Sequence, residues 1–380
     1  MFSTIVAVIF AVIAALLAYY YNDLKYTLEL LGYFRDAVPY DGSKNCRIIS
    51  GPTSCEDIVI HHPSGYAFMA CADSGINRLT QYWPPLGTFA NMSYEPRDLA
   101  WVYNIKTNEA SVLTFKNLPE DTDLSFHGLG IYDDDSTNHT KLSLFFVNHR
   151  RTGSVIEIFE HTIGTKELIH LETVKHELIY TPNDVVPVSA NEFFVTNDFR
   201  HRHKGIMRKP WSNVVFHSSA SNITRIAADG IAYPNGIAAN WDKSIIYVIS
   251  TSDGEVILYE RRQDNRIIEL ERIRLGYPAD NAAIDEVTGE IYIAGFPKVL
   301  KSIAYFEDPS GKYPRPPSVI LKISNNTDPD RYFGKKYKVS KVLEDNGEFF
   351  HSFSISAVDH KRNALLLGSI FKETWRCDLK

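Results

Sequence analysis

The sequence predicts an all-β protein, a six-bladed β-propeller with an N-terminal hydrophobic helix. A unit recurs six times: a polar residue, an apolar run, a turn with Gly, Asp or Asn, and a second apolar run. Unit starts lie about 45 to 75 residues apart, and repeats of about 40–50 residues with four short strands are typical of propeller blades. A β-sandwich or two smaller β domains are the alternatives. No Pro-, Gly- or Ser-rich linker divides the chain, so we favour one ring of blades.

The paired apolar runs can be followed in order along the chain. They occupy residues 56–60 and 66–70, 127–132 and 142–147, 183–188 and 192–196, 235–240 and 244–249, 280–284 and 290–294, and 352–358 and 364–368. A ring of blades has to join its first blade to its last. Cys46 and Cys377 lie near the two ends of this part, so a disulfide between them would close the ring.

The N-terminus carries a targeting segment. Residues 2–21 contain no charged side chain, and about 20 apolar residues can span a bilayer as a helix. The basic start and the clean Ala-x-Ala site of a cleaved signal peptide are missing, although cleavage stays open. We expect a signal-anchor over 1–21, a stalk or short helix over 22–45 and the propeller over 46–380. The chain then enters the secretory pathway and is membrane-anchored with a lumenal or extracellular catalytic domain, or secreted.

Composition agrees with this route. The formal charge of −6 is mild, so no nucleic-acid partner is expected. The spacing of the four cysteines fits no zinc motif, which favours disulfides or buried thiols, and four cysteines allow three pairings. Four Asn-x-Ser/Thr sequons are candidate glycosylation sites. They start at Asn91, Asn138, Asn222 and Asn325.

Oxygen-bearing side chains and one imidazole open five of the six units. Inner strands of a propeller converge on a central channel, so these residues are expected to meet. They are Glu56, Asp57, His127, Asn183, Asp184, Asn235, Asp280 and Asn281. Ca²⁺ takes six to eight oxygen ligands of this kind, whereas zinc and copper favour thiolates and imidazoles. We therefore expect calcium in the channel.

Polar residues that are adjacent in the sequence are expected to bind different ions. Successive side chains in a strand point to opposite sides, so Glu56 and Asp57 are not expected to face one ion. The same argument separates Asn183 from Asp184. The pattern predicts two calcium ions, one at the mouth of the channel and one deeper. Asp280 and Asn281 could share the first site if the backbone there is irregular.

Two histidines form a candidate acid–base pair. His127 opens the second unit, and His149 ends the strand that returns from it, so a hairpin could bring them together. An imidazole titrates near neutrality and can take a proton from water. The alternative is that either histidine is a hydrogen-bonded loop residue.

Together these motifs resemble the serum paraoxonase/arylesterase family over nearly the whole chain. The matching residues are Ser54-x-Glu56-Asp57, Phe126-His127-Gly128, Val147-Asn148-His149, Asn183-Asp184-Val185, Thr196-Asn197-Asp198, 211–215, Asn235-Gly236-Ile237, Asp280-Asn281, Leu366-Leu367-Gly368 and Cys377. The resemblance implies a propeller with two calcium ions that hydrolyses lactones and aryl esters, so the expected partner is a small-molecule lactone or ester.

The resemblance also implies residue roles. The catalytic calcium would be held by Glu56, Asn183, Asn235, Asp280 and Asn281, and the structural calcium by Asp57, Asp184 and the carbonyl of Leu129. His127 and His149 fall on the family's proposed dyad, and Cys46 and Cys377 on its disulfide. Cys55 and Cys71 are additional and could pair across the first hairpin.

The chain departs from the family in places. Gly295 stands at the family's free-thiol position, and the segment after Asp198 is basic, with His201-Arg202-His203-Lys204. Two other functions remain open. One is a different propeller lactonase or a strictosidine-synthase-like protein, whose fold need not carry the metal set. The other is a non-enzymatic binding propeller.

Overall fold

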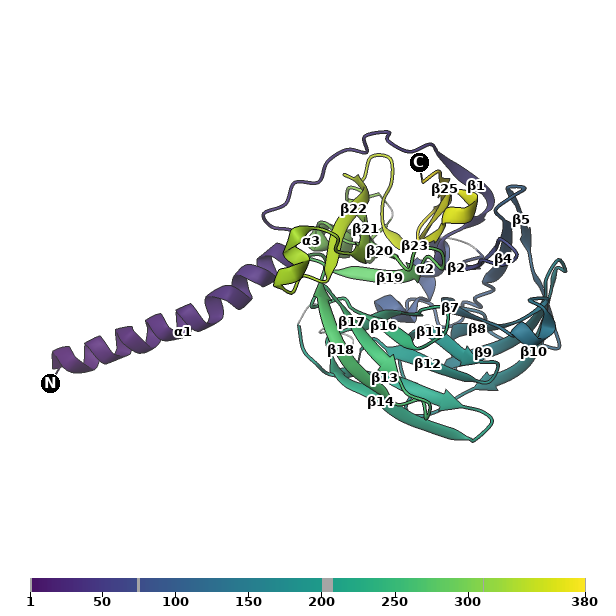
Figure 1. The fold of residues 1–380 in the computed structure, drawn as a ribbon, viewed down its shortest axis with the longest axis horizontal. Coiled ribbons are helices and arrows are strands. Elements are labelled where there is room, and N and C mark those ends of the chain that lie inside the picture. The colour runs from purple at the N-terminus through teal and green to yellow at the C-terminus, as the bar shows by residue number, and fades with distance from the viewer. Residues whose placement is uncertain (1, 74–75, 200–207, 310, 380) are drawn as a thin grey trace.

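Six β-sheets surround a central axis, and one long helix projects from the body (Figure 1). The computed structural model describes residues 2–73, 76–199, 208–309 and 311–379. The innermost strands are β2, β7, β11, β15, β19 and β23, and each contacts the next, with β23 returning to β2. The predicted six-bladed propeller is therefore confirmed.

The blades follow the chain in order, and five have four strands. The first blade is β2 Cys55–His61, β3 Tyr66–Cys71, β4 Leu99–Asn104 and β5 Glu109–Val112. The second is β7 Phe126–Asp133, β8 Lys141–Arg150, β9 Gly153–Thr162 and β10 Glu167–Val174, with β6 Thr114–Lys116 added at its edge. The third is β11 Pro182–Ser189, β12 Glu192–Asn197, β13 Ser212–Ser218 and β14 Ile223–Ile231. The fourth blade is β15 Pro234–Ala239, β16 Ile245–Ser250, β17 Glu255–Arg261 and β18 Ile267–Arg274. The fifth is β19 Ala279–Ile284, β20 Ile291–Gly295, β21 Ser318–Asn325 and β22 Tyr337–Asp345. The sixth is β23 Phe353–Asp359, β24 Ala364–Ser369, β25 Glu373–Cys377 and β1 Cys46–Thr53.

The two ends of the propeller meet in the sixth blade. Strand β1 comes from the start of the domain and pairs antiparallel with β25, the last strand, so that Cys46 faces Cys377. A disulfide joins these two cysteines across 331 residues of sequence. A second disulfide joins Cys55 to Cys71 across the β2–β3 hairpin. Both expected pairings are present.

Apolar side chains fill the space between neighbouring blades. Phe68 of the first blade packs in one cluster with Phe126, Phe146 and Phe159 of the second. A further cluster joins the first blade to the sixth through Ile58 and other residues. The inner strands are buried on both faces, which explains why they read as continuous apolar runs rather than as alternating ones. Full burial of one such side chain contributes about 1.5–3 kcal/mol.

The N-terminal helix α1 spans Phe2–Leu30 and runs unbroken past residue 21, where the anchor was expected to end. Residues Val8–Leu30 are long and apolar enough to cross a membrane by length and composition, with a mean hydropathy of 1.3. Its last turns dock on the propeller. The Tyr26 hydroxyl donates to the Asp253 carbonyl at 2.7 Å, and Leu30 is buried. The exposed helix is therefore held against the propeller at its C-terminal end.

Two short helices complete the described part of the chain. Helix α2, Ile76–Gln81, lies in the connection between β3 and β4, and α3, Val299–Glu307, lies between β20 and β21. The side chain of Arg78 in α2 is fully buried. This buried residue reaches the site described next.

Candidate functional site

Every inner strand is irregular at the point where its polar residue stands. The pairing register shifts near the start of β2, β7, β11, β15, β19 and β23. Such bulges re-aim side chains and are over-represented beside active sites. On β19 the shift lies between Ala279 and Ala282, so Asp280 and Asn281 both lie in the irregular segment. This supplies the irregular backbone that a shared ion would need.

Glycine lets neighbouring inner strands come unusually close here. A Cβ on Gly128 of β7 would lie 2.4 Å from the Asp184 Cα, and one on Gly236 of β15 would lie 2.7 Å from the Asn281 Cα. Contacts under 3.0 Å with backbone atoms require the chain to move. The two glycines therefore bring polar residues of neighbouring blades together.

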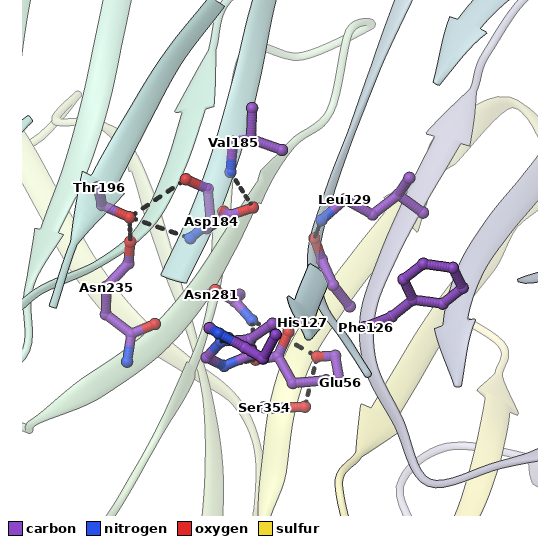
Figure 2. A network of polar contacts seen from close by, with 12 residues as sticks. Glu56, Phe126, His127, Leu129, Asp184, Val185, Thr196, Asn235, Asn281 and Ser354 are labelled. Carbon is purple, nitrogen blue, oxygen red and sulfur yellow. Dashed lines mark hydrogen bonds and ion pairs between the residues drawn. The ribbon is translucent and has the colours of Figure 1, made fainter. Parts of the chain in front are cut away.

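Several buried side-chain oxygens at the end of the channel where the inner strands start have no hydrogen-bond partner among the described residues. They are Glu56 Oε2, Asn183 Oδ1, Asn235 Oδ1 and Asn281 Oδ1. Their residues are at most 3% exposed. The other oxygen of Glu56, Oε1, accepts from Asn281 Nδ2 at 2.7 Å (Figure 2). An unpartnered buried oxygen is costly, and a hard cation satisfies such oxygens. The donor set therefore fits calcium.

Four carboxyl groups of this cluster have raised pKa values. Burial raises the pKa of Glu56 well above its ordinary value, and repulsion from Asp280 and Asp57 adds to the effect. Burial likewise raises the pKa of Asp57 and of Asp280 to about 7. Burial and the charge of Asp57 raise the pKa of Asp184. Carboxylates gathered in a buried place repel one another unless a cation or protons lie between them.

Asp57 and Asp184 repeat one hydrogen-bonding arrangement two blades apart. Asp57 Oδ1 accepts from the next backbone N–H, that of Ile58, at 2.8 Å, and Oδ2 accepts from the Leu129 N–H at 2.7 Å. Asp184 accepts from the Val185 N–H at 2.7 Å and from the Ile237 N–H at 2.8 Å. Each carboxylate thus joins its own blade to the following one.

Leu129 accordingly contacts Asp57 through its N–H in this structure. Thr196 adds a further link, because its hydroxyl donates to the Asn235 carbonyl at 2.6 Å, across blades three and four (Figure 2). The carboxylates of Asp57 and Asp184 therefore have partners, whereas Glu56 Oε2 and the three amide oxygens have none among the residues that the structure describes. The assignment of these residues to two separate ions stays a prediction.

The two histidines are in direct contact. His127 Nδ1 lies 3.1 Å from His149 Nε2, and His149 Nδ1 lies 2.8 Å from Ser154 Oγ. The other nitrogen of His127, Nε2, lies 3.6 Å from Glu56 Oε1. Both rings are at least 95% buried, and burial, followed by the charge of Arg78, lowers the pKa of His127 to about 3. His127 is therefore neutral near pH 7.

Arg78 and Asp98 lie behind the dyad and were not predicted from the sequence. The Arg78 guanidinium lies 3.8 Å from the centre of the Trp83 ring and 2.7 Å from Asp98 Oδ2, and all three side chains are buried. The Trp83 ring meets both imidazoles edge-on, with centroids 5.1 and 6.0 Å away. A charged residue in a connecting helix gives no periodic signal, so only the tertiary structure could reveal this support.

The sixth blade also contributes a residue. Ser354 of β23 donates its hydroxyl to the Glu56 carbonyl at 2.6 Å. Ser354 stands in the second position of its inner strand, the position that holds Glu56 in the first blade. That equivalence was the available signal, although a hydroxyl did not suggest a ligand.

The other sequence predictions have different standing. All four sequon asparagines are exposed, while glycosylation stays a prediction. The basic segment at residues 201–204 lies outside the described part of the chain.

The fold and site define the protein as a six-bladed propeller with a buried cluster of carboxylates, amides and paired imidazoles at one end of its channel. The family model for arylesterase matches residues 39–379. The chain belongs to the arylesterase family.

Curated relatives cover most of the chain. It is 30% identical over 347 residues to serum paraoxonase/arylesterase 2 of Gallus gallus, covering 88% of this chain and 89% of that one. It is 29% identical over 345 residues to serum paraoxonase/lactonase 3 of Mus musculus, with 88% and 89% covered. Among solved structures, a luciferin-regenerating enzyme has a TM-score of 0.51 at 12% identity, with 88% and 95% covered. That likeness concerns the fold.

Proposed function

We propose that this protein is a calcium-dependent hydrolase of lactones and aryl esters. The observation that carries the proposal is the His127–His149 contact beside a cluster of buried oxygens that have no hydrogen-bond partner in the described part of the chain. Membership of the arylesterase family and relatives named as arylesterases and lactonases support the reaction class. The substrate would be a small uncharged ester or lactone.

Calcium would be held at two places. Glu56, Asn183, Asn235, Asp280 and Asn281 would hold the catalytic ion. Asp57, Asp184 and Leu129 would hold the structural one. When bound at the first place, calcium supplies a positive charge that polarises the carbonyl oxygen of the substrate and stabilises an oxyanion.

The dyad would handle the proton of the attacking water. His127 is neutral near pH 7 and can accept a proton, but its low pKa makes it a weak base. A direct hydrogen bond to His149 lets the proton leave His127, and Ser154 orients the second ring through Nδ1. Trp83 packs against both rings and keeps water away from that face.

Turnover of phenyl acetate and of an aliphatic lactone tests the proposal. Each is measured with calcium present, after removal of calcium with a chelator, and after calcium is restored. We expect activity that disappears with chelation and returns with calcium. Absence of turnover for both substrates in calcium would overturn the hydrolase assignment and favour a binding propeller. Turnover that survives exhaustive chelation would instead overturn the role of calcium.

Membrane association is the second part of the proposal. The apolar stretch Val8–Leu30, which is exposed along its first three quarters, is consistent with a signal-anchor that places the propeller in the lumen or outside the cell. Fractionation of cells that express the full chain, with and without carbonate extraction, checks this. Recovery of a shortened chain in the medium would favour a cleaved signal peptide.

A further inference from the structure

Two histidines and one aspartate converge at the far end of the channel. His61 is the last residue of β2, Asp133 is the last residue of β7, and His139 lies in the loop that follows β7. Asp133 Oδ2 lies 2.9 Å from His61 Nε2 and 2.5 Å from His139 Nδ1. One ligand atom from each residue lies within 4.8 Å of the other two. The cluster spans the first and second blades.

This cluster is separate from the proposed calcium residues. His127 and Asp133 are the second and last residues of the same strand, and Glu56 and His61 have the same relation on β2. A strand rises about 3.3 Å per residue, so the cluster is about 16–20 Å from Glu56 and His127 and about 13 Å from Asp57 and Leu129. The dyad and His61–Asp133–His139 therefore occupy opposite ends of the inner strands.

A cavity of about 440 Å³ opens beside the cluster. It is lined by His61, Asp133 and His139, and it reaches inward to Asp57 and Asp184. An ion held by the three residues could keep a coordination position open toward this space. Catalytic and other open zinc sites have this composition, three protein ligands and one position for water.

The buried histidine is oriented for ligation. His61 is 2% exposed, and its Nδ1 lies 2.7 Å from Ser64 Oγ, which leaves Nε2 directed at Asp133. Metal-ligating histidines commonly fix their second nitrogen in this way.

The two oxygens of the Asp133 carboxylate differ in their hydrogen bonding. Both imidazoles meet the same oxygen, Oδ2, whereas Asp133 Oδ1 is buried without a hydrogen-bond partner among the described residues. Tetrahedral ligands at zinc distances of about 2.0–2.1 Å lie about 3.3 Å apart. Each of the two nitrogens would have to move away from Asp133 Oδ2 by less than about 1 Å to reach this spacing. The side chain of His139 is 42% exposed on a loop, so it can make this adjustment.

We propose that His61, Asp133 and His139 form a binding site for a divalent transition-metal ion of the zinc class, linking the first two blades at the end of the channel remote from the dyad. Two imidazole nitrogens and one carboxylate oxygen suit zinc, whereas calcium takes oxygen ligands. The ion would exchange with solvent through the cavity. This site is independent of the proposed hydrolase activity.

Direct metal binding tests the site. The full-length protein, purified in calcium, is titrated with Zn²⁺ against a competing chelator, and bound zinc is counted by elemental analysis. We expect one zinc per chain in addition to calcium. Co²⁺ in place of zinc should give the visible absorption of a low-coordinate nitrogen and oxygen site. Absence of zinc binding by the wild type would overturn the proposal.

Matched variants separate this site from adventitious binding. His139→Ala, at a half-exposed position, should weaken zinc binding at least about tenfold, and Ser64→Ala should weaken it about 10–100-fold through lost orientation. The control is His62→Ala, which removes the neighbouring histidine that also lines the cavity. Equal zinc binding by His139→Ala and His62→Ala would overturn the assignment.

Stability provides a second readout. Zinc should raise the melting temperature of the wild type and of His62→Ala, because an ion that binds only the folded state stabilises it by mass action. Zinc should not do so for His139→Ala or Asp133→Asn. A zinc-induced shift of the same size in all four proteins would contradict the proposal.

Discussion

The backbone N–H of Leu129 donates a 2.7 Å hydrogen bond to Asp57 Oδ2 and so joins the second blade to the first. The same bond recurs between the Ile237 N–H and Asp184, at 2.8 Å. Both carboxylates are buried, and both also accept the N–H of the residue that follows them. Asp57 and Asp184, each the second of two adjacent polar residues on its strand, therefore link neighbouring blades.

This relationship predicts different effects for two neighbouring acids. Asp57→Asn should mainly lower stability, because an amide nitrogen placed opposite the Leu129 N–H leaves two donors facing each other. The loss should be about 1–3 kcal/mol in the free energy of unfolding. Glu56→Gln should mainly lower activity, since Glu56 Oε2 has no partner among the described residues. Urea unfolding and lactone turnover are measured for both variants in calcium.

A reversed order would contradict this division. If Glu56→Gln unfolded more easily than Asp57→Asn while keeping its turnover, the roles of the two acids would have to be exchanged.

The imidazole pair predicts a loss of catalysis without a loss of fold. His127→Gln and His149→Gln should each lower kcat by about 10²–10⁴-fold, the range typical of a lost general acid or base. The double variant should lose little more than either single variant, because the two rings act as one unit. Melting curves show whether the variants are folded.

Retained activity has a definite meaning for the dyad. If His127→Gln kept full lactone turnover, the proton would have to be taken by Glu56 or Asp280 instead, and the histidine contact would be structural.

The two disulfides predict unequal contributions to stability. Cys46 and Cys377 are 331 residues apart, whereas Cys55 and Cys71 are 16 apart. In the chain-entropy account, removing the first link lowers the free energy of unfolding by about 6 kcal/mol and removing the second by about 3 kcal/mol. Urea unfolding of the paired Cys→Ser variants measures both, and a larger loss from the 55–71 pair would contradict the account.

His351 predicts an acid-sensitive component of stability. Burial lowers the pKa of His351 from 6.5 to about 4, so its stabilising contribution is fully present above pH 6.5. Between pH 6.5 and 4 the unfolded chain binds a proton that the folded chain does not, and stability falls by about 3 kcal/mol.

Replacement of this histidine isolates the effect. Urea unfolding of His351→Gln at pH 8 gives the cost of the replacement itself, and at pH 4 the variant should recover about 3 kcal/mol relative to the wild type. A constant difference between the two proteins at all pH values would show that His351 does not titrate in this range.

Much of the architecture was predictable because it is local and repeated. The apolar runs of each unit follow from short-range patterning, and the β2–β3 and β11–β12 hairpins form at the residues where the runs stand. The polar residue at each inner-strand start recurs at a fixed place in the unit. Their place in the repeat unit was therefore enough to predict the candidate oxygen-bearing residues.

The propeller, the N-terminal apolar helix and the candidate residues at the starts of the inner strands could be predicted from the sequence. Only the tertiary structure decided which atoms meet. Strand alternation predicts that the side chains of Glu56 and Asp57 face opposite sides of the strand. The hydrogen bond from the Leu129 N–H to Asp57, by contrast, depends on how the first two blades pack. Arg78 beneath Trp83 and the His61–Asp133–His139 cluster are likewise decided by packing, because their members lie in different segments and share no repeat position.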